Sequence, residues 1–135
     1  MRDIKMDLYD AFLADEFISQ HVTNGNIKFY EYPNAQAITG TVIVIDEIIS
    51  PEIKDFADNN PMTLEYIFQI DVFVKQTNNN VNASVNSSEL ILRIQKLMWE
   101  VFGFGVFNSF APEYNSDHKL ARQSKQFRGR KYISN

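Results

Sequence analysis

"TLEYIFQIDVFVKQ", residues 63–76, alternates apolar and polar side chains more regularly than any other stretch of the chain. Every even position from 64 to 74 is apolar, which predicts a strand that packs one face against a core. A strand of this length spans on the order of 40 Å at ~3.3 Å per residue, more than a small domain usually covers. We therefore expect part of the strand to project, and we expect Ile67 and Phe73, the large apolar side chains on its polar face, to contact a partner.

The size and composition of the chain predict one domain over residues 1–135. Of its 135 residues, 44% are hydrophobic, which suits a single packed core. The chain has no cysteine, so disulfides, thiolate nucleophiles and cysteine-based metal sites are excluded. Charges recur every few residues near the N-terminus and no long apolar run follows, so we expect a cytosolic protein without a signal peptide or a membrane span.

The segments around the long strand predict an α+β fold. Apolar side chains recur at helical spacing in two segments, and β-branched, aromatic or basic runs bounded by turn residues predict strands. We expect helices at 3–18 and 88–102, strands at 27–32, 41–49, 63–76, 103–116 and 120–133, and a loop at 50–61. These elements predict a small, largely antiparallel or mixed sheet of about four to five strands packed by two helices, with the long strand or its hairpin projecting toward neighbours.

An Asn-rich stretch separates the long strand from the second helix. The sequence "TNNNVNASVNSS" has little that could pack, which predicts a mobile loop at about 77–87. Asn86 with Glu89 three residues later resembles a capping box, and Gly103 is suited to end the helix.

Charge is divided unevenly along the chain. Residues 1–117 hold 7 Lys and Arg against 17 Asp and Glu, whereas residues 118–135 hold 6 Lys and Arg and no acid. An acidic body argues against nucleic-acid binding and favours salt-dependent, head-to-tail contact between copies. The basic strand has three possible roles: a solvated sheet edge, a contact for an acidic protein, or a contact for nucleic acid. The residues that we expect at interfaces are Ile67, Phe73, Lys75, Arg122, Lys125, Arg128, Arg130 and Lys131.

The titratable residues show no arrangement typical of catalysis. His21 and His118 lack partners at a ligand or triad spacing. Two acidic groups, Asp3 with its helical neighbours and Asp46 with Glu47, are interpreted as solvated faces rather than cation sites. We therefore expect no enzymatic activity, no cofactor and no metal.

Four segments carry a resemblance to a known family. They are "FYEYP" at 29–33, "YIFQIDVFVK" at 66–75, "SSELILRIQKLMWEVFGF" at 87–104 and "APEYNSDHKLARQSKQFRGRKYI" at 111–133. In this order they resemble the tail terminators of long-tailed bacteriophages, also called tail-completion or tail-to-head joining proteins. The resemblance covers nearly the whole chain but transfers no residue-level motif.

The resemblance implies a structural virion protein. It implies a ring of identical subunits, typically hexameric, that ends the tail tube at its head-proximal end and joins it to the head connector. The implied partners are other copies, the tail tube protein and the head-completion or connector protein. The implied location is the tail or neck of the virion, after assembly in the cytoplasm of the host bacterium. DNA would pass through the lumen without specific binding, since an acidic wall repels phosphate.

Two other functions stay open on the sequence. One is another phage neck or head-completion protein, which would also lack catalytic chemistry. The other, of a different class, is a small-molecule-binding or enzymatic α+β domain with a pocket formed by Trp99, His118 and the aromatic side chains of 103–116.

Overall fold

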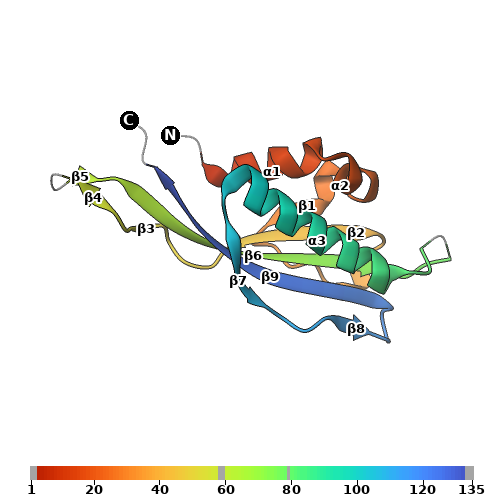
Figure 1. Ribbon diagram of the computed structural model, residues 1–135. Coiled ribbons are helices and arrows are strands. Elements are labelled where there is room, and N and C mark those ends of the chain that lie inside the picture. The colour runs from red at the N-terminus through yellow and green to blue at the C-terminus, as the bar shows by residue number, and fades with distance from the viewer. Residues whose placement is uncertain (1–2, 58–59, 79, 133–135) are drawn as a thin grey trace.

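A mixed sheet with helices on one face forms the fold in the computed structural model, which describes residues 3–57, 60–78 and 80–132 (Figure 1). The helices are α1 (Ile4–Ala14), α2 (Glu16–His21) and α3 (Ala83–Phe102). The strands are β1 (Ile27–Phe29), β2 (Thr41–Glu47), β3 (Glu52–Ile53), β4 (Phe56–Ala57), β5 (Asn60–Pro61), β6 (Thr63–Lys75), β7 (Gly105–Ser109), β8 (Glu113–Asn115) and β9 (Leu120–Tyr132).

The main sheet has seven strands within the described residues, in the order β1-β2-β6-β9-β7, with β3 beside β6 and β8 beside β9. Only the pair β1–β2 is parallel among the registered pairs, so the sheet is mixed but largely antiparallel. The α+β class is confirmed. The expected four to five strands and two helices are too few, because short segments add strands and the first helix is divided.

The prediction of one continuous helix over 3–18 is wrong, because the helix is interrupted at Asp15. The backbone of Asp15 is extended, with φ −74° and ψ 125°, and its carboxylate accepts a hydrogen bond of 3.0 Å from the N–H of Ile18. This contact caps the start of α2. The same carboxylate lies 2.6 Å from the Arg93 guanidinium, so it also fastens α2 to α3.

The second long helix begins earlier than predicted, at Ala83. The backbones of Thr77 and Asn80 exchange hydrogen bonds of 3.0 and 3.1 Å, which form a tight turn before the helix. The side-chain amide of Asn86 donates to that of Asn80 across 2.6 Å, within the first turns of α3. The expected loop at about 77–87 is therefore too long, because residues 83–87 belong to α3 and only 77–78 and 80–82 connect β6 to it among the described residues. The expected Asn86–Glu89 cap is wrong, since both residues lie inside α3, and residue 79 lies outside the described residues. The predicted end is confirmed, since Gly103 adopts φ 72° after α3.

The long strand is confirmed as β6, a strand of 13 residues whose even positions from 66 to 74 are buried. The strand predicted at 27–32 ends at Phe29, because Tyr30 takes a left-handed φ of 62°. The loop predicted at 50–61 instead contains β3, β4 and β5.

Of the three roles left open for the basic last strand, that of a sheet edge does not hold for most of its length. β9 pairs with β6 over the full 13 residues of each strand. On its other side β8 covers Leu120–Arg122 and β7 covers Lys125–Arg128. Only residues 129–132 form an edge in the described chain.

The core has two parts, one on each face of the sheet. The larger lies between the sheet and the helices and includes Phe12, Phe68 and Ile94, all fully buried. The smaller lies on the opposite side, which we call the open face, where Ile38 packs against Val42, Val44, Phe73 and Leu120. The segment that contains Ile38 therefore covers one end of the open face.

Gly129 allows an aromatic ring to lie directly against β9. Phe104 is fully buried, and its ring occupies the space where a side chain at position 129 would stand. Tyr66 and Phe68 stack on the same ring at centroid distances of 6.2 and 6.1 Å. This aromatic group closes the end of the main core.

Gly129→Ala is expected to lower the free energy of unfolding by about 1–3 kcal/mol, because the added methyl group overlaps the Phe104 ring. Chemical denaturation measures this loss. The control is Gly40→Ala, since a methyl group there meets no atom within 4 Å and should change stability by less than ~1 kcal/mol. Equal stability of the two variants would contradict the packing of Phe104 on Gly129.

Asp15→Asn is expected to destabilise the fold by about 1–3 kcal/mol near neutral pH, because the charged hydrogen bonds to Arg93 are lost. Burial alone raises the pKa of Asp15, but the hydrogen bonds from Arg93 and from the N–H of Ile18 outweigh it and lower the pKa. A lowered folded pKa stabilises the protein above the unfolded pKa of about 3.9, and this contribution disappears as the pH falls through the folded value.

The difference in stability between wild type and Asp15→Asn should therefore shrink below about pH 4. Unfolding curves recorded from pH 7 to pH 2 measure it. Asp117→Asn, at an exposed turn position, serves as the control and should match wild type throughout. A constant difference across this range would show that the Asp15 charge has no such role.

Candidate functional site

One end of the β6–β9 pair extends beyond the helices and carries the main candidate surface (Figure 1). We call this part the arm and define it as residues 52–57, 60–65 and 129–132. In it β3 pairs with the beginning of β6, through Glu52 opposite Glu65 and Ile53 opposite Leu64. The end of β9 continues on the other side of β6. The expectation that the long strand projects is confirmed by this arrangement.

Large apolar side chains are exposed on the arm. Ile53 is 47% exposed, Phe56 62%, Met62 39% and Tyr132 78%. Figure 1 shows the three helices lying over the body of the sheet and not over the arm. Ile53 pairs with Leu64 and Tyr132 with Thr63, so these two side chains lie on opposite faces of the strands. The arm therefore exposes apolar side chains on both faces, which is a feature of interaction surfaces.

The arm also presents an open strand edge. Among the described residues no strand pairs with positions 129–132 of β9 on the side away from β6. Backbone N–H and C=O groups at such an edge can pair with a strand of another chain. The arm therefore offers both apolar contacts and backbone hydrogen bonds.

Ion pairs hold the arm together. Arg130 lies 3.2 Å from the carboxylate of Asp55 and 3.5 Å from that of Glu65, which joins β9 to β6 and to the segment between β3 and β4. Lys54 lies 3.2 Å from Glu52 and 3.9 Å from Glu65. These charges are thus partly neutralised within one molecule.

A second, buried charge centre lies on the open face of the body. Asp71 is fully buried, and its carboxylate lies 3.2 Å from a guanidinium nitrogen of Arg122. The amide of Gln69 donates to the other carboxylate oxygen. The Arg122 guanidinium lies over the Phe73 and Tyr32 rings, at 5.2 and 5.9 Å from their centroids. Arg122 is therefore fixed by its own chain.

Tyr32 extends this polar group toward β2. Burial and then the negative charge of Asp71 raise the pKa of the Tyr32 hydroxyl above its ordinary value, and Asp46 adds to the effect. The hydroxyl stays protonated at neutral pH and donates to Asp46 across 3.3 Å.

The structure does not gather the sequence-predicted contact residues into one patch. Phe73 is only 7% exposed and packs in the smaller core, so little of it is left for a partner and its expected role as a contact is corrected. Ile67 is half-buried on the open face opposite Arg128, whose guanidinium lies 4.9 Å from the Phe107 ring. The other predicted residues lie as follows: Lys75 donates to the backbone carbonyl of His118, Lys125 donates to Gln95, Arg122 pairs with Asp71, and Arg130 and Lys131 lie on the arm.

Sequence reasoning missed the apolar side chains of the arm. Ile53 and Phe56 fall in "SPEIKDFADNNP", where most neighbours are polar or turn-forming. The only available signal was the presence of two large apolar residues in a predicted loop. Such a signal is weak, because single exposed apolar side chains are common.

The alternative pocket of Trp99 and His118 is not assembled. Trp99 is exposed on α3 and lies near Gly105, which pairs with Arg128 of β9. His118 lies in the turn before β9, at the opposite end of that strand. Within the described residues, no group of three or more His, Cys, Asp or Glu side chains is placed to hold a metal ion. No helix in the described part of the chain combines the length and apolarity needed to cross a bilayer.

Comparison of the chain with protein-family models, and with curated proteins, found no match in either case.

Asp71→Asn is expected to cost about 1–3 kcal/mol of unfolding free energy, because it removes the charged hydrogen bond between the buried Asp71 carboxylate and Arg122, which is itself partly exposed. The matched control is Asp55→Asn, which removes a carboxylate from an exposed pair with another arginine of β9. An exposed pair contributes less than about 1 kcal/mol. Thermal and chemical unfolding of both variants measure the contrast, and equal losses would refute the difference between the two pairs.

Proposed function

We propose that this protein is a structural subunit that assembles with copies of itself into a ring, acting as a tail terminator of a long-tailed phage. The ring would end the tail tube, contact the head connector and let DNA pass through its lumen. The observation that carries the proposal is the arm, which extends exposed apolar side chains and an open strand edge away from the core. The order of the four resembling segments supports the place in the phage tail, and a hexamer is the expected ring size.

A closed ring requires two different surfaces on each subunit, one for each neighbour. The arm is one such surface. The outer side of α3 provides another, because Val85, Leu92 and Trp99 are exposed at intervals of seven residues and so lie on one side of the helix. We propose that the arm of one copy packs on this side of α3 of the next.

The charge distribution supports apolar contact as the main driving force for assembly of the proposed ring. Arg122 and Arg130 already pair with carboxylates of their own chain, which reduces the charge available to a neighbour. Burial of apolar side chains is worth roughly 25 cal/mol per Å² removed from water. Salt-dependent assembly stays a prediction, because the remaining cations of β9 and the arm can contact a neighbouring copy.

Phe56→Glu on the arm and Leu92→Glu on α3 are each expected to abolish the ring, because a charge then replaces an apolar contact. Light scattering after size-exclusion chromatography gives the mass, and negative-stain electron microscopy shows whether wild type forms rings. Tyr114→Glu is the control, since Tyr114 is also an exposed aromatic residue and lies on β8, away from the arm. The Tyr114→Glu variant should still form the ring.

Mixing the two variants tests the pairing of the two surfaces. The Phe56→Glu copy keeps its α3 surface and the Leu92→Glu copy keeps its arm, so the mixture can form one intact junction. We expect a heterodimer and no larger species. Homodimers of either variant would show that a surface pairs with itself, and a monomeric wild type at high concentration would refute the proposed ring.

A further inference from the structure

The arm has two faces, and they carry different side chains. Leu64 of β6 packs at the margin of the main core, so it lies on the side of the sheet that bears the helices. Ile53 and Lys131 are both opposite Leu64 in the strand register and share this side. Glu65 and Arg130 are opposite each other one position along, and they therefore lie on the open face. We call the face with Ile53, Leu64 and Lys131 the helix side of the arm.

The open face of the arm is unfavourable for docking because its charges are already paired. Arg130 lies 3.2 Å from Asp55 and 3.5 Å from Glu65, and Lys54 lies 3.2 Å from Glu52. A partner that covered these pairs would remove them from water, which costs free energy unless new polar contacts replace the hydration. The helix side is therefore the better contact surface.

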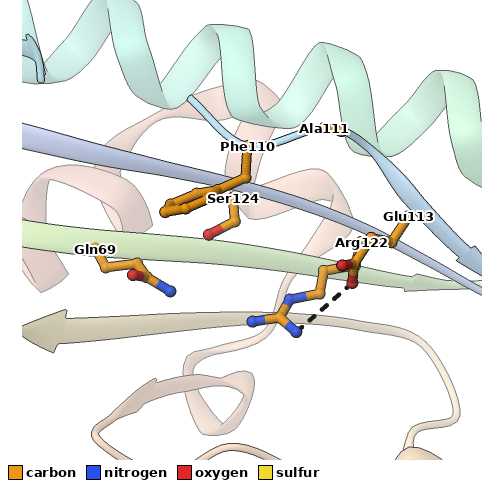
Figure 2. A pocket seen from close by; sticks show the side chains of 6 residues that line it. All are labelled: Gln69, Phe110, Ala111, Glu113, Arg122 and Ser124. Carbon is orange, nitrogen blue, oxygen red and sulfur yellow. Dashed lines mark ion pairs between the residues drawn. The ribbon is translucent and has the colours of Figure 1, made fainter. Parts of the chain in front are cut away.

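The helix side is apolar at its centre and carries a cation at its margin. Ile53 is 47% exposed beside Leu64, and Lys131 lies on the other side of Leu64. The ion pairs of the described arm use other cations, and none uses Lys131. On the body, by contrast, Arg122 is already paired, and Figure 2 shows it beside the carboxylate of Glu113, 3.7 Å away, at a hollow in the open face. Lys131 is thus available to a carboxylate of another chain.

The outer side of α3 has a complementary pattern of apolar and charged side chains. Glu89 lies four residues after Val85 and three before Leu92, and Lys96 stands in the same relation to Leu92 and Trp99, so both charges lie on the apolar side of the helix. Both are exposed, and neither has an ion pair among the described residues. An incoming cation therefore meets an available carboxylate at Glu89 and a like charge at Lys96.

A hollow of about 430 Å³ lies beside Leu92, between α2 and α3. It is lined by Phe17, Glu89, Leu92, Arg93 and Lys96. Phe17 and Leu92 provide apolar walls, and the contact of Arg93 with Asp15 fixes the two helices on either side. The hollow therefore accepts an apolar side chain, and Glu89 in its wall can meet a cation that accompanies that side chain.

We propose that the helix side of the arm docks on α3 of the next copy, with Ile53 in this hollow and Lys131 against Glu89. This inference rests on the proposed ring and adds which face of the arm is used and where it lies on α3. Ile53 and Lys131 lie two strands apart, about 10 Å, a distance that the long side chains of Lys131 and Glu89 can bridge while Ile53 stays in the hollow. Repulsion between Lys131 and Lys96 favours this placement over one nearer Trp99.

Substitutions on the two faces of the arm test which face is used. Ile53→Glu is expected to abolish the ring, whereas Tyr132→Glu, on the open face opposite Thr63, should leave it intact. Light scattering after size-exclusion chromatography measures the mass. The docking is overturned if Ile53→Glu still forms the ring or if Tyr132→Glu loses it, and the ring itself stands as long as wild type forms it. A monomeric wild type refutes both.

An exchange of charge tests the contact of Lys131 with Glu89 at a single junction. That junction joins the Leu92→Glu copy, which keeps its arm, to the Phe56→Glu copy, which keeps its α3 surface. Lys131→Glu is added to the first copy and Glu89→Lys to the second. Each reversal alone is expected to raise the dissociation constant about three- to tenfold, and the two together should return it to within about twofold of the starting value. Isothermal titration calorimetry measures these constants.

Lys96→Glu in the copy that keeps its α3 surface is the matched control, because Lys96 is exposed on the same side of α3 but is placed away from Lys131. It should not weaken the junction. The proposed contact is overturned if the combined reversals do not restore affinity, or if Lys96→Glu weakens binding as much as Glu89→Lys does. This exchange also tests the helix side of the arm should Ile53→Glu unfold the protein.

Discussion

The antiparallel pairing of β6 with β9 is the constraint on which the rest of the structure depends. It runs without interruption from Thr63 opposite Tyr132 to Lys75 opposite Leu120. β2 and β3 add to the free side of β6, and β7 and β8 add to the free side of β9. The two long strands therefore belong to the body at one end and to the arm at the other. A shift of one residue in their register would exchange the buried and exposed faces along the whole molecule.

The boundary between body and arm is set by packing at Gly129. The ring of Phe104 occupies the space above this glycine, and Tyr66 beside it is the last deeply buried residue toward the arm on that face of β6. Beyond this point the strands continue, because hydrogen bonding between strands does not require a second layer. Apolar side chains there stay exposed in the monomer, since no helix follows them. The arm is thus a direct consequence of strands that are longer than the core that covers them.

The sequence predicted those elements that depend on local periodicity. The alternation in 63–76 was sufficient to predict β6 and its buried face, and Gly103 was sufficient to predict the end of α3. The break at Asp15 was missed although its cap on Ile18 is local, whereas the contact with Arg93, 78 residues away in the sequence, was not predictable. The interior position of β9 was missed for a similar reason: it depends on pairing with β7 and β8. At the candidate site, Arg130 and Lys131 were predicted, whereas Ile53 and Phe56 were hidden in a polar segment.

The pairing of β6 with β9 also changes how the uneven charge along the chain is interpreted. Counting charges by segment indicated a basic end that could reach an acidic neighbour. The fold instead places part of that basic end beside carboxylates of its own chain, where Arg122 lies near Asp71 and Arg130 lies near Asp55. These two arginines are therefore matched within one molecule by carboxylates that are far from them in the sequence. In the proposed ring, contact between copies would then rely more on the exposed apolar side chains of the arm and of α3, because these side chains do not pack within the monomer.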